Sequence, residues 1–167
     1  MFQYGKIDMI VDAVRGELAE ATANIPWVTH SLVIVSDEPN ASPAMPQDRW
    51  IVVTPSPQAQ FDPAALGGGS WLQATVRSRV IVTVHHGADL RDVPDRINEF
   101  FMGESRSINI DARAVIKTLI RKQNWEGPDG LPLLNDPILP AETNFAKAKS
   151  GGSIQIAFDI EYDEDLT

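Results

Sequence analysis

Hydrophobic residues near the N-terminus recur at the spacing of an α-helix. They fall three or four positions apart, with acidic residues between them, at Ile7, Ile10, Val11, Val14 and Leu18. Such a stripe predicts an amphipathic helix that buries one face against a core. We expect the helix to end near Thr22, before Pro26, because proline does not continue a helix.

Residues 71–85 alternate between apolar and polar side chains, which is the period of a β-strand. The apolar side comprises Leu72, Ala74, Val76, Val80, Val82 and Val84. The other side comprises Gln73, Thr75, Arg77, Arg79 and Thr83, with Ile81 as an exception. A strand of this length would extend for about 50 Å. We therefore expect a bend or bulge near Ser78.

The chain closes on a second alternating segment. Its apolar positions are Ile154, Ile156, Phe158, Ile160 and Tyr162, and between them lie Gln155, Ala157, Asp159, Glu161 and Asp163. One buried and one solvated face favour an antiparallel sheet. Short apolar runs predict further strands at residues 31–36 and 49–54. Two more helices are predicted at residues 89–102 and 111–123, the latter with its inward face at Val115, Ile116, Leu119 and Ile120.

This order of elements predicts one α+β domain over residues 1–167. We expect a mainly antiparallel sheet, flanked by helices on one face. Long Pro/Gly-rich loops are predicted at residues 37–48, 55–70 and 124–152, and loops of this length are usually functional or mobile. The glycine run at 67–69 is interpreted as a hinge, because a strand follows it and a phosphate loop needs a lysine and a helix there.

Composition narrows the chemistry. The 167 residues contain 23 acidic and 14 basic side chains, a net charge of −9, and no cysteine. Disulfides, thiolate metal sites and a cysteine nucleophile are therefore excluded. An acidic surface repels nucleic acid unless its cations are clustered. The N-terminal segment is too charged for a secretory signal, and no apolar run is long enough for a membrane helix. We expect a protein made in the cytoplasm.

Catalytic patterns are sparse. His85 and His86 end the long predicted strand, with Asp89 and Asp92 close behind. A metal-dependent enzyme built on these residues is one alternative. However, adjacent strand residues point to opposite faces, so surface histidines are favoured. The chain has no G-x-S-x-G nucleophile elbow. We therefore expect no enzymatic activity, no cofactor and no metal.

Two other binding functions stay open. A small-ligand or carbohydrate-binding module could use tryptophan faces for stacking, although tryptophans are more often core and loop anchors. The four tryptophans are Trp27, Trp50, Trp71 and Trp125. A calcium site could use the carboxylates of the last strand, although a strand gives little curvature for wrapping an ion.

Charge is unevenly distributed along the chain. Arg113, Lys117 and Arg121 are spaced by four, which places them in a stripe on one helix face. Residues 159–165 contain five acids and no base. Opposite charges at two separate places suit head-to-tail contact between copies. The alternatives are solvated faces, pairing within one subunit, or a stripe that lines a DNA channel.

The layout of the chain resembles the tail-terminator and tail-completion proteins of long-tailed bacteriophages, typified by minor tail protein U. The resemblance covers residues 4–22, 48–54, 70–102 and 152–163. It rests on an N-terminal helix followed by RWIVVTP, WLQATVRSRVIVTVHH, DVPDRINEFFMG and GGSIQIAFDIEYDED. The long Pro-rich loops and the helix at 111–123 depart from the family layout. A neck or head–tail connector protein of similar fold is therefore the alternative.

The resemblance implies a virion structural protein without catalytic residues. Such proteins form a homo-oligomeric ring, commonly a hexamer, that caps the tail tube, ends its growth and joins it to the neck and head. The expected partners are other copies, tail-tube and neck proteins, with non-specific DNA contact in the channel and no membrane. The interface candidates are Trp71, Arg113, Lys117, Arg121, Asp159, Glu161 and Asp163. Arg77 and Arg79 are candidates for facing the channel.

Overall fold

The structure is a computed structural model that describes residues 5–23, 33–43, 49–62, 73–87, 108–148 and 151–165. These stretches form two helices and a six-stranded sheet, which confirms the α+β class. The helices are α1 (Lys6–Ala23) and α3 (Ile108–Arg121). The strands are β1 (Val33–Val35), β2 (Arg49–Pro55), β3 (Gln60–Asp62), β4 (Gln73–Gly87), β5 (Leu139–Ala148) and β6 (Gly151–Asp165). The predicted helix at 89–102 and the glycine run lie outside the described residues.

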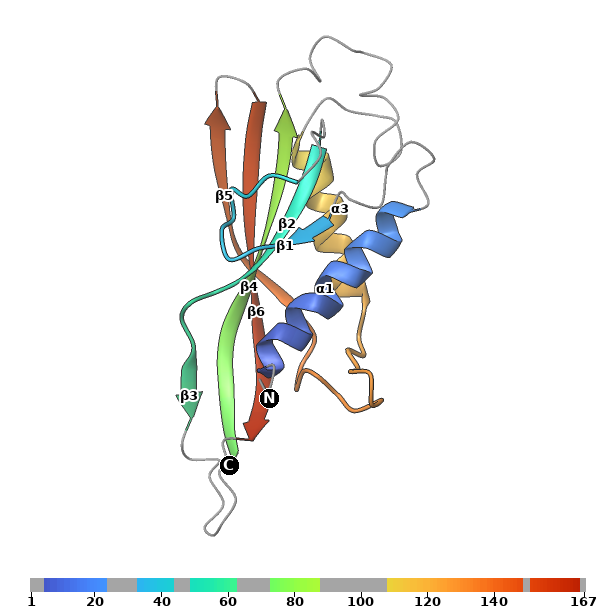
Figure 1. Ribbon diagram of the computed structural model, residues 1–167, viewed down its shortest axis with the longest axis vertical. Coiled ribbons are helices and arrows are strands. Elements are labelled where there is room, and N and C mark those ends of the chain that lie inside the picture. The colour runs from blue at the N-terminus through green and yellow to red at the C-terminus, as the bar shows by residue number, and fades with distance from the viewer. Residues whose placement is uncertain are drawn as a thin grey trace.

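The sheet is built around one long antiparallel pair, β4 and β6. Its strand order is β1-β2-β4-β6-β5, and β3 also pairs with β4. Every pair is antiparallel except β1 with β2. Figure 1 shows β4 and β6 running the length of the molecule, with β1, β2 and β5 beside one half and β3 beside the other.

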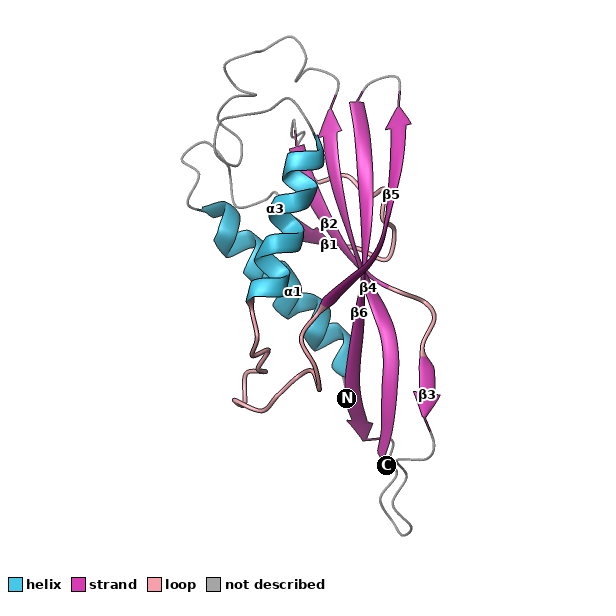
Figure 2. Cartoon of the chain, turned by 180° about the vertical axis from the view of Figure 1, so that it is seen from behind, coloured by secondary structure: helices cyan, strands magenta, loops and turns pink. Residues whose placement is uncertain are grey.

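Of the bend or bulge expected near Ser78, the bulge is absent from the β4–β6 ladder. The β4–β6 ladder runs without a register shift from Gln73↔Asp165 to Gly87↔Gly151. The two strands twist around each other instead (Figure 2), because twist accommodates length without breaking the ladder. What changes at Ser78 is the partner on the other side of β4, which is β3 before this residue and β2 after it.

Both helices cover one face of the sheet, and the core lies between the two layers (Figure 2). The stripe predicted for α1 is confirmed, since its residues at 10, 11, 14 and 18 are buried. The alternation predicted for β4 and β6 is confirmed on the core side, whereas Thr83 and Ala157, expected on the solvated side, are also buried. The fully buried residues include Val76, Val80, Ile156, Phe158 and Leu119. Ile120 was expected in the core but is 42% exposed, because it lies about 100° around α3 from Leu119.

Two of the predicted loops contain strands. β5 lies inside the predicted loop at 124–152, and β3 lies inside the one at 55–70. Residues 139–144 of β5 are all exposed, so this edge strand shows no alternation that a pattern could reveal. Pairing with β6 forms it nonetheless, with a register shift between Pro140 and Glu142. Before β5, Trp125, Leu133 and Ile138 anchor the same segment in the core.

A helix that crosses a membrane needs about 20 predominantly apolar residues. No helix in the described part of the chain is long and apolar enough to cross a bilayer.

Candidate functional site

The sheet face turned away from the helices carries charged residues of β4 and β6 opposite one another. The Arg77 Nε donates to Glu161 Oε2 at 3.2 Å, and the Arg79 Nε donates to Asp159 Oδ1 at 3.0 Å. Both pairs are direct register partners. Asp163 continues the row, and its Oδ1 accepts the Thr75 hydroxyl at 3.0 Å. We call Arg77, Arg79, Asp159, Glu161 and Asp163 the charged ladder.

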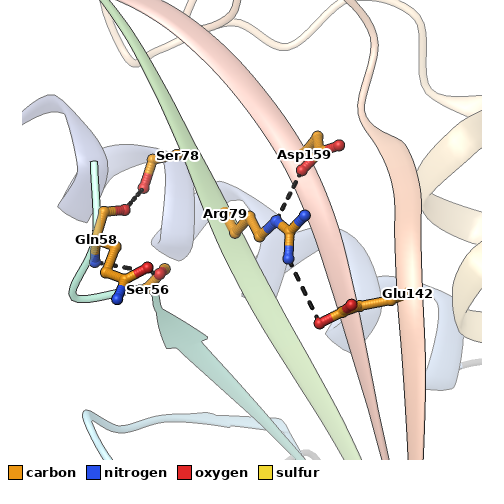
Figure 3. A network of polar contacts seen from close by, with 6 residues as sticks. All are labelled: Ser56, Gln58, Ser78, Arg79, Glu142 and Asp159. Atoms are coloured by element: carbon orange, nitrogen blue, oxygen red, sulfur yellow. Dashed lines mark hydrogen bonds and ion pairs between the residues drawn. The ribbon is translucent and has the colours of Figure 1, made fainter. Parts of the chain in front are cut away.

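Two residues from outside the long strand pair extend the charged ladder. Arg79 Nη1 lies 3.5 Å from Glu142 Oε1 on β5, so its guanidinium group bridges two carboxylates (Figure 3). The Asn135 side-chain amide donates to Asp163 Oδ1 at 3.0 Å. The charged ladder of β4 and β6 is thus connected to β5 through Glu142 and to the segment before β5 through Asn135.

A groove of about 570 Å³ lies over the charged ladder. Its floor includes four of the five ladder residues, Arg77, Arg79, Asp159 and Glu161. The rest of the lining comprises Ser56, Gln58, Gln60, Ser78, Asp136, Pro137, Leu139 and Ile160. Figure 3 shows Ser56 and Gln58 from this lining, where the backbone carbonyl of Gln58 accepts a hydrogen bond from the Ser78 hydroxyl at 2.9 Å. Asp136 adds a further carboxylate to the lining.

The ladder contributes charge more than stability. The Arg77 and Arg79 side chains are 67% and 44% exposed, and exposed ion pairs contribute only about 0–1 kcal/mol each. The charged ladder, Asp136 and Glu142 together comprise five carboxylates and two guanidinium groups. Asp62 of β3, the register partner of Thr75, adds a sixth carboxylate to this face. The face therefore has an acidic excess, even though several of its charges are paired within the chain.

The predicted basic stripe lies on the helix layer, on the opposite side of the sheet. Arg113, Lys117 and Arg121 are all exposed on α3, and none pairs with another described residue. Lys122, one position further on, behaves differently. Its Nζ lies 2.9 Å from Glu17 Oε2 and 5.2 Å from the centre of the Trp125 ring. The stripe thus presents three cations to solvent.

The C-terminal strand, which carries the interface candidates Asp159, Glu161 and Asp163, is not a free edge of the sheet over its whole length. Through Asp159, β6 lies between β4 and β5. Beyond that point the Glu161 carbonyl accepts the Asn135 N–H at 2.8 Å, and the Asp163 carbonyl accepts Lys6 Nζ at 2.9 Å. The segment around Asn135 and the start of α1 therefore cover part of β6 beyond Asp159.

The other candidates separate into two groups. His85 is buried, lies 2.8 Å from the Pro39 carbonyl through Nε2 and stacks on Trp50 with ring centres 4.8 Å apart. Within the described residues no group of three possible ligands is placed to hold a metal ion. Trp71, Trp27, Asp89, Asp92 and the His86 side chain lie outside what the structure describes.

Sequence reasoning missed the groove and the roles of Asn135 and Glu142. Arg79 and Glu142 are 63 residues apart in the chain, and Asn135 and Asp163 are 28 apart. No local pattern relates residues at such separations. Two sequence signals pointed to this face: the acidic excess of residues 159–165 and the alternation that puts Arg77 and Arg79 on the polar side of their strand.

The pH dependence of stability provides a test of the packing beside the ladder. Burial, with the nearby carboxylates of Glu164 and Asp8, raises the pKa of Tyr162 to about 12. An unfolded tyrosine titrates near pH 10, so the stabilisation is complete below that pH and is lost as the pH rises toward 12. We expect urea unfolding of the native chain to show this alkaline decline and Tyr162→Phe to reduce it. Equal declines in both proteins would contradict the burial of this phenol.

Comparison with known proteins assigns the chain to no family. Neither a scan of protein-family models nor a comparison with curated proteins finds a match to the chain.

Proposed function

We propose that the protein is a non-catalytic structural component of a bacteriophage virion. In this proposal its copies form a ring, a hexamer in the simplest case, that caps the tail tube, ends its growth and joins it to the neck and head. The protein would be made in the host cytoplasm and function at the junction of tail and head. The proposal joins the family resemblance of the sequence to the arrangement of charge on the fold.

The observation that carries the proposal is the placement of two opposite charges on opposite layers of one domain. The basic stripe lies on α3, and the charged ladder, with its acidic excess, lies on the face of the sheet turned away from the helices. A surface that meets a different surface on the next copy makes a heterologous contact, and such contacts form a ring when the rotation between successive copies closes. A two-fold dimer would instead need one self-complementary patch, whereas the stripe carries only cations and the charged ladder has an acidic excess.

The competing functions receive less support from the described residues. A ligand-binding module would use exposed tryptophan faces, yet Trp125 is 3% exposed. Trp50 stacks on His85 and donates its Nε1–H to the Ala41 carbonyl at 3.0 Å. A neck or head–tail connector of similar fold shares the same two surfaces, and the choice of partner in the experiment separates it from a terminator.

The test combines the full chain with the tail-tube protein encoded near it. We expect the chain to form rings under negative-stain electron microscopy and to bind tube ends. Tubes polymerised in its presence should stop growing, while tubes alone should continue. Rings that bind an isolated neck or portal ring, and leave tube growth unchanged, would replace the terminator with the connector. A chain that remains monomeric and binds neither partner would contradict both.

A further inference from the structure

We propose that the basic stripe of α3 in one copy docks in the groove over the charged ladder of the next copy, with Lys117 against Glu161. This inference rests on the proposed ring and names the two surfaces that build it. It assigns an intersubunit role to a helix face and a sheet face that lie on opposite sides of one subunit.

The spacing of the two rows of charges carries the inference. Arg113, Lys117 and Arg121 recur every four residues, a rise of about 6 Å per step along a helix. Carboxylates on one face of β6 recur every two residues, a rise of about 6.6 Å per step along a strand. Three cations and three carboxylates therefore match over about 12–13 Å when the helix lies along the strand.

The central pair does not depend on the direction of the helix. If α3 runs parallel to β6, Arg113 meets Asp159, and if it runs antiparallel, Arg113 meets Asp163. Lys117 meets Glu161 in both cases, because each is the middle member of its row. The register thus singles out one pair for the first test.

The ladder carboxylates have hydrogen-bonding capacity left for a neighbour. Each contacts described residues through one oxygen, which is Oδ1 in Asp159, Oε2 in Glu161 and Oδ1 in Asp163. Among the described residues the second oxygen of each accepts no hydrogen bond. A carboxylate can accept several bonds at once, so a cation from another copy needs to break none of the existing pairs.

Arg77 and Arg79 have a positioning role in this contact. They hold Glu161 and Asp159 from the β4 side, and Arg79 also holds Glu142 (Figure 3). Fixing these carboxylates before association lowers the entropy cost of ordering them in the interface. The acidic excess of this face is opposite in sign to the three cations of the stripe, which favours attraction between copies and repulsion between two identical faces.

The sharpest test mixes two variants that each fail alone. Lys117→Glu reverses the centre of the stripe, and Glu161→Lys reverses the centre of the ladder. Each variant alone should assemble with a dissociation constant at least about tenfold weaker, measured by analytical ultracentrifugation at low salt. An equimolar mixture should assemble again, because each reversed surface then faces the reversed surface of the other variant. Raising the salt concentration should weaken the native assembly by screening these pairs.

Two controls separate the contact from folding and from net charge. Arg15→Glu makes the same charge change as Lys117→Glu on α1, where Arg15 pairs with Asp12 at 3.2 Å, and should leave assembly unchanged. Glu161→Lys also places a cation beside Arg77, so Glu161→Gln provides a milder variant that should weaken assembly less. Urea unfolding of each variant shows that it remains folded.

The outcomes distinguish the contact from the function. Rings of native strength from Lys117→Glu, or a mixture that fails to assemble, would overturn the contact while leaving a ring that caps tubes intact. Assembly restored in the mixture, with no effect on tail tubes, would support the contact and contradict the proposed function. If Lys117→Glu leaves assembly unchanged but abolishes binding of duplex DNA, the stripe faces DNA and the contact is wrong.

Discussion

Replacing Ile156 with aspartate is expected to prevent the chain from folding at neutral pH. Ile156 is fully buried in β6 between its register partners Val82 and Thr143. A carboxylate there has no cation to pair with in the apolar core, and burying an unpaired charge costs several kcal/mol. Because a domain is stable by only about 5–15 kcal/mol in total, this cost removes most of the folding free energy.

The adjacent residue supplies the matched control. Gln155 is next to Ile156 on the same strand but points to the opposite face, where it is only half-buried. Gln155→Asp should change the free energy of unfolding by about 1 kcal/mol or less. Circular dichroism and urea unfolding at pH 7 compare the two variants. Similar stability in both would show that the buried face of β6 has been assigned incorrectly.

Truncating Phe158 to alanine is expected to lower the free energy of unfolding by about 3–5 kcal/mol. Among the described residues Phe158 is the largest fully buried side chain, and it lies in β6 between Val80 of β4 and Pro140 of β5. Removing its ring loses apolar burial and leaves a cavity, because strands held by two ladders cannot collapse into the space. Phe158 also lies where β6 pairs with both β4 and β5, so the truncation affects the packing of all three strands.

The measurement for Phe158 is the urea midpoint at an unchanged denaturant slope. The control is Asn144→Ala, an exposed position of β5 opposite Gln155, which removes a side chain of the same sheet without opening the core. We expect it to change the free energy by about 0.5 kcal/mol or less. A loss below about 1 kcal/mol for Phe158→Ala would mean that this residue does not lie at the centre of the core.

The charge of the protein illustrates how structure changes an inference from composition. The net charge of −9 first argues only against nucleic acid. Along the chain it divides into an acidic end and a basic helix, and the structure then places the two on opposite layers. Two of the five acids of the acidic end, Glu161 and Asp159, are paired with Arg77 and Arg79, which are 84 and 80 residues away. The interaction surface is therefore a mixed ladder with an acidic excess.

Local periodicity was sufficient to predict the elements that bury one face. The stripe in α1 and the alternation in β4 and β6 are confirmed because a buried face requires apolar residues at the period of the backbone. The prediction that Ile120 faces the core was wrong, because this residue lies beside the buried stripe of α3 and not within it. The predictions for residues outside the described stretches, Trp71 among them, stay predictions.

The sequence by itself thus determined the fold class, the core faces of the long strands and the exposed basic stripe. Only the tertiary structure decided the strand order, the existence of β3 and β5, and the meeting of Arg79 with Asp159 and Glu142. The physical reason is that exposed edge strands and cross-strand ion pairs leave no periodic signal. They form because distant segments are brought together by a core whose own pattern is local.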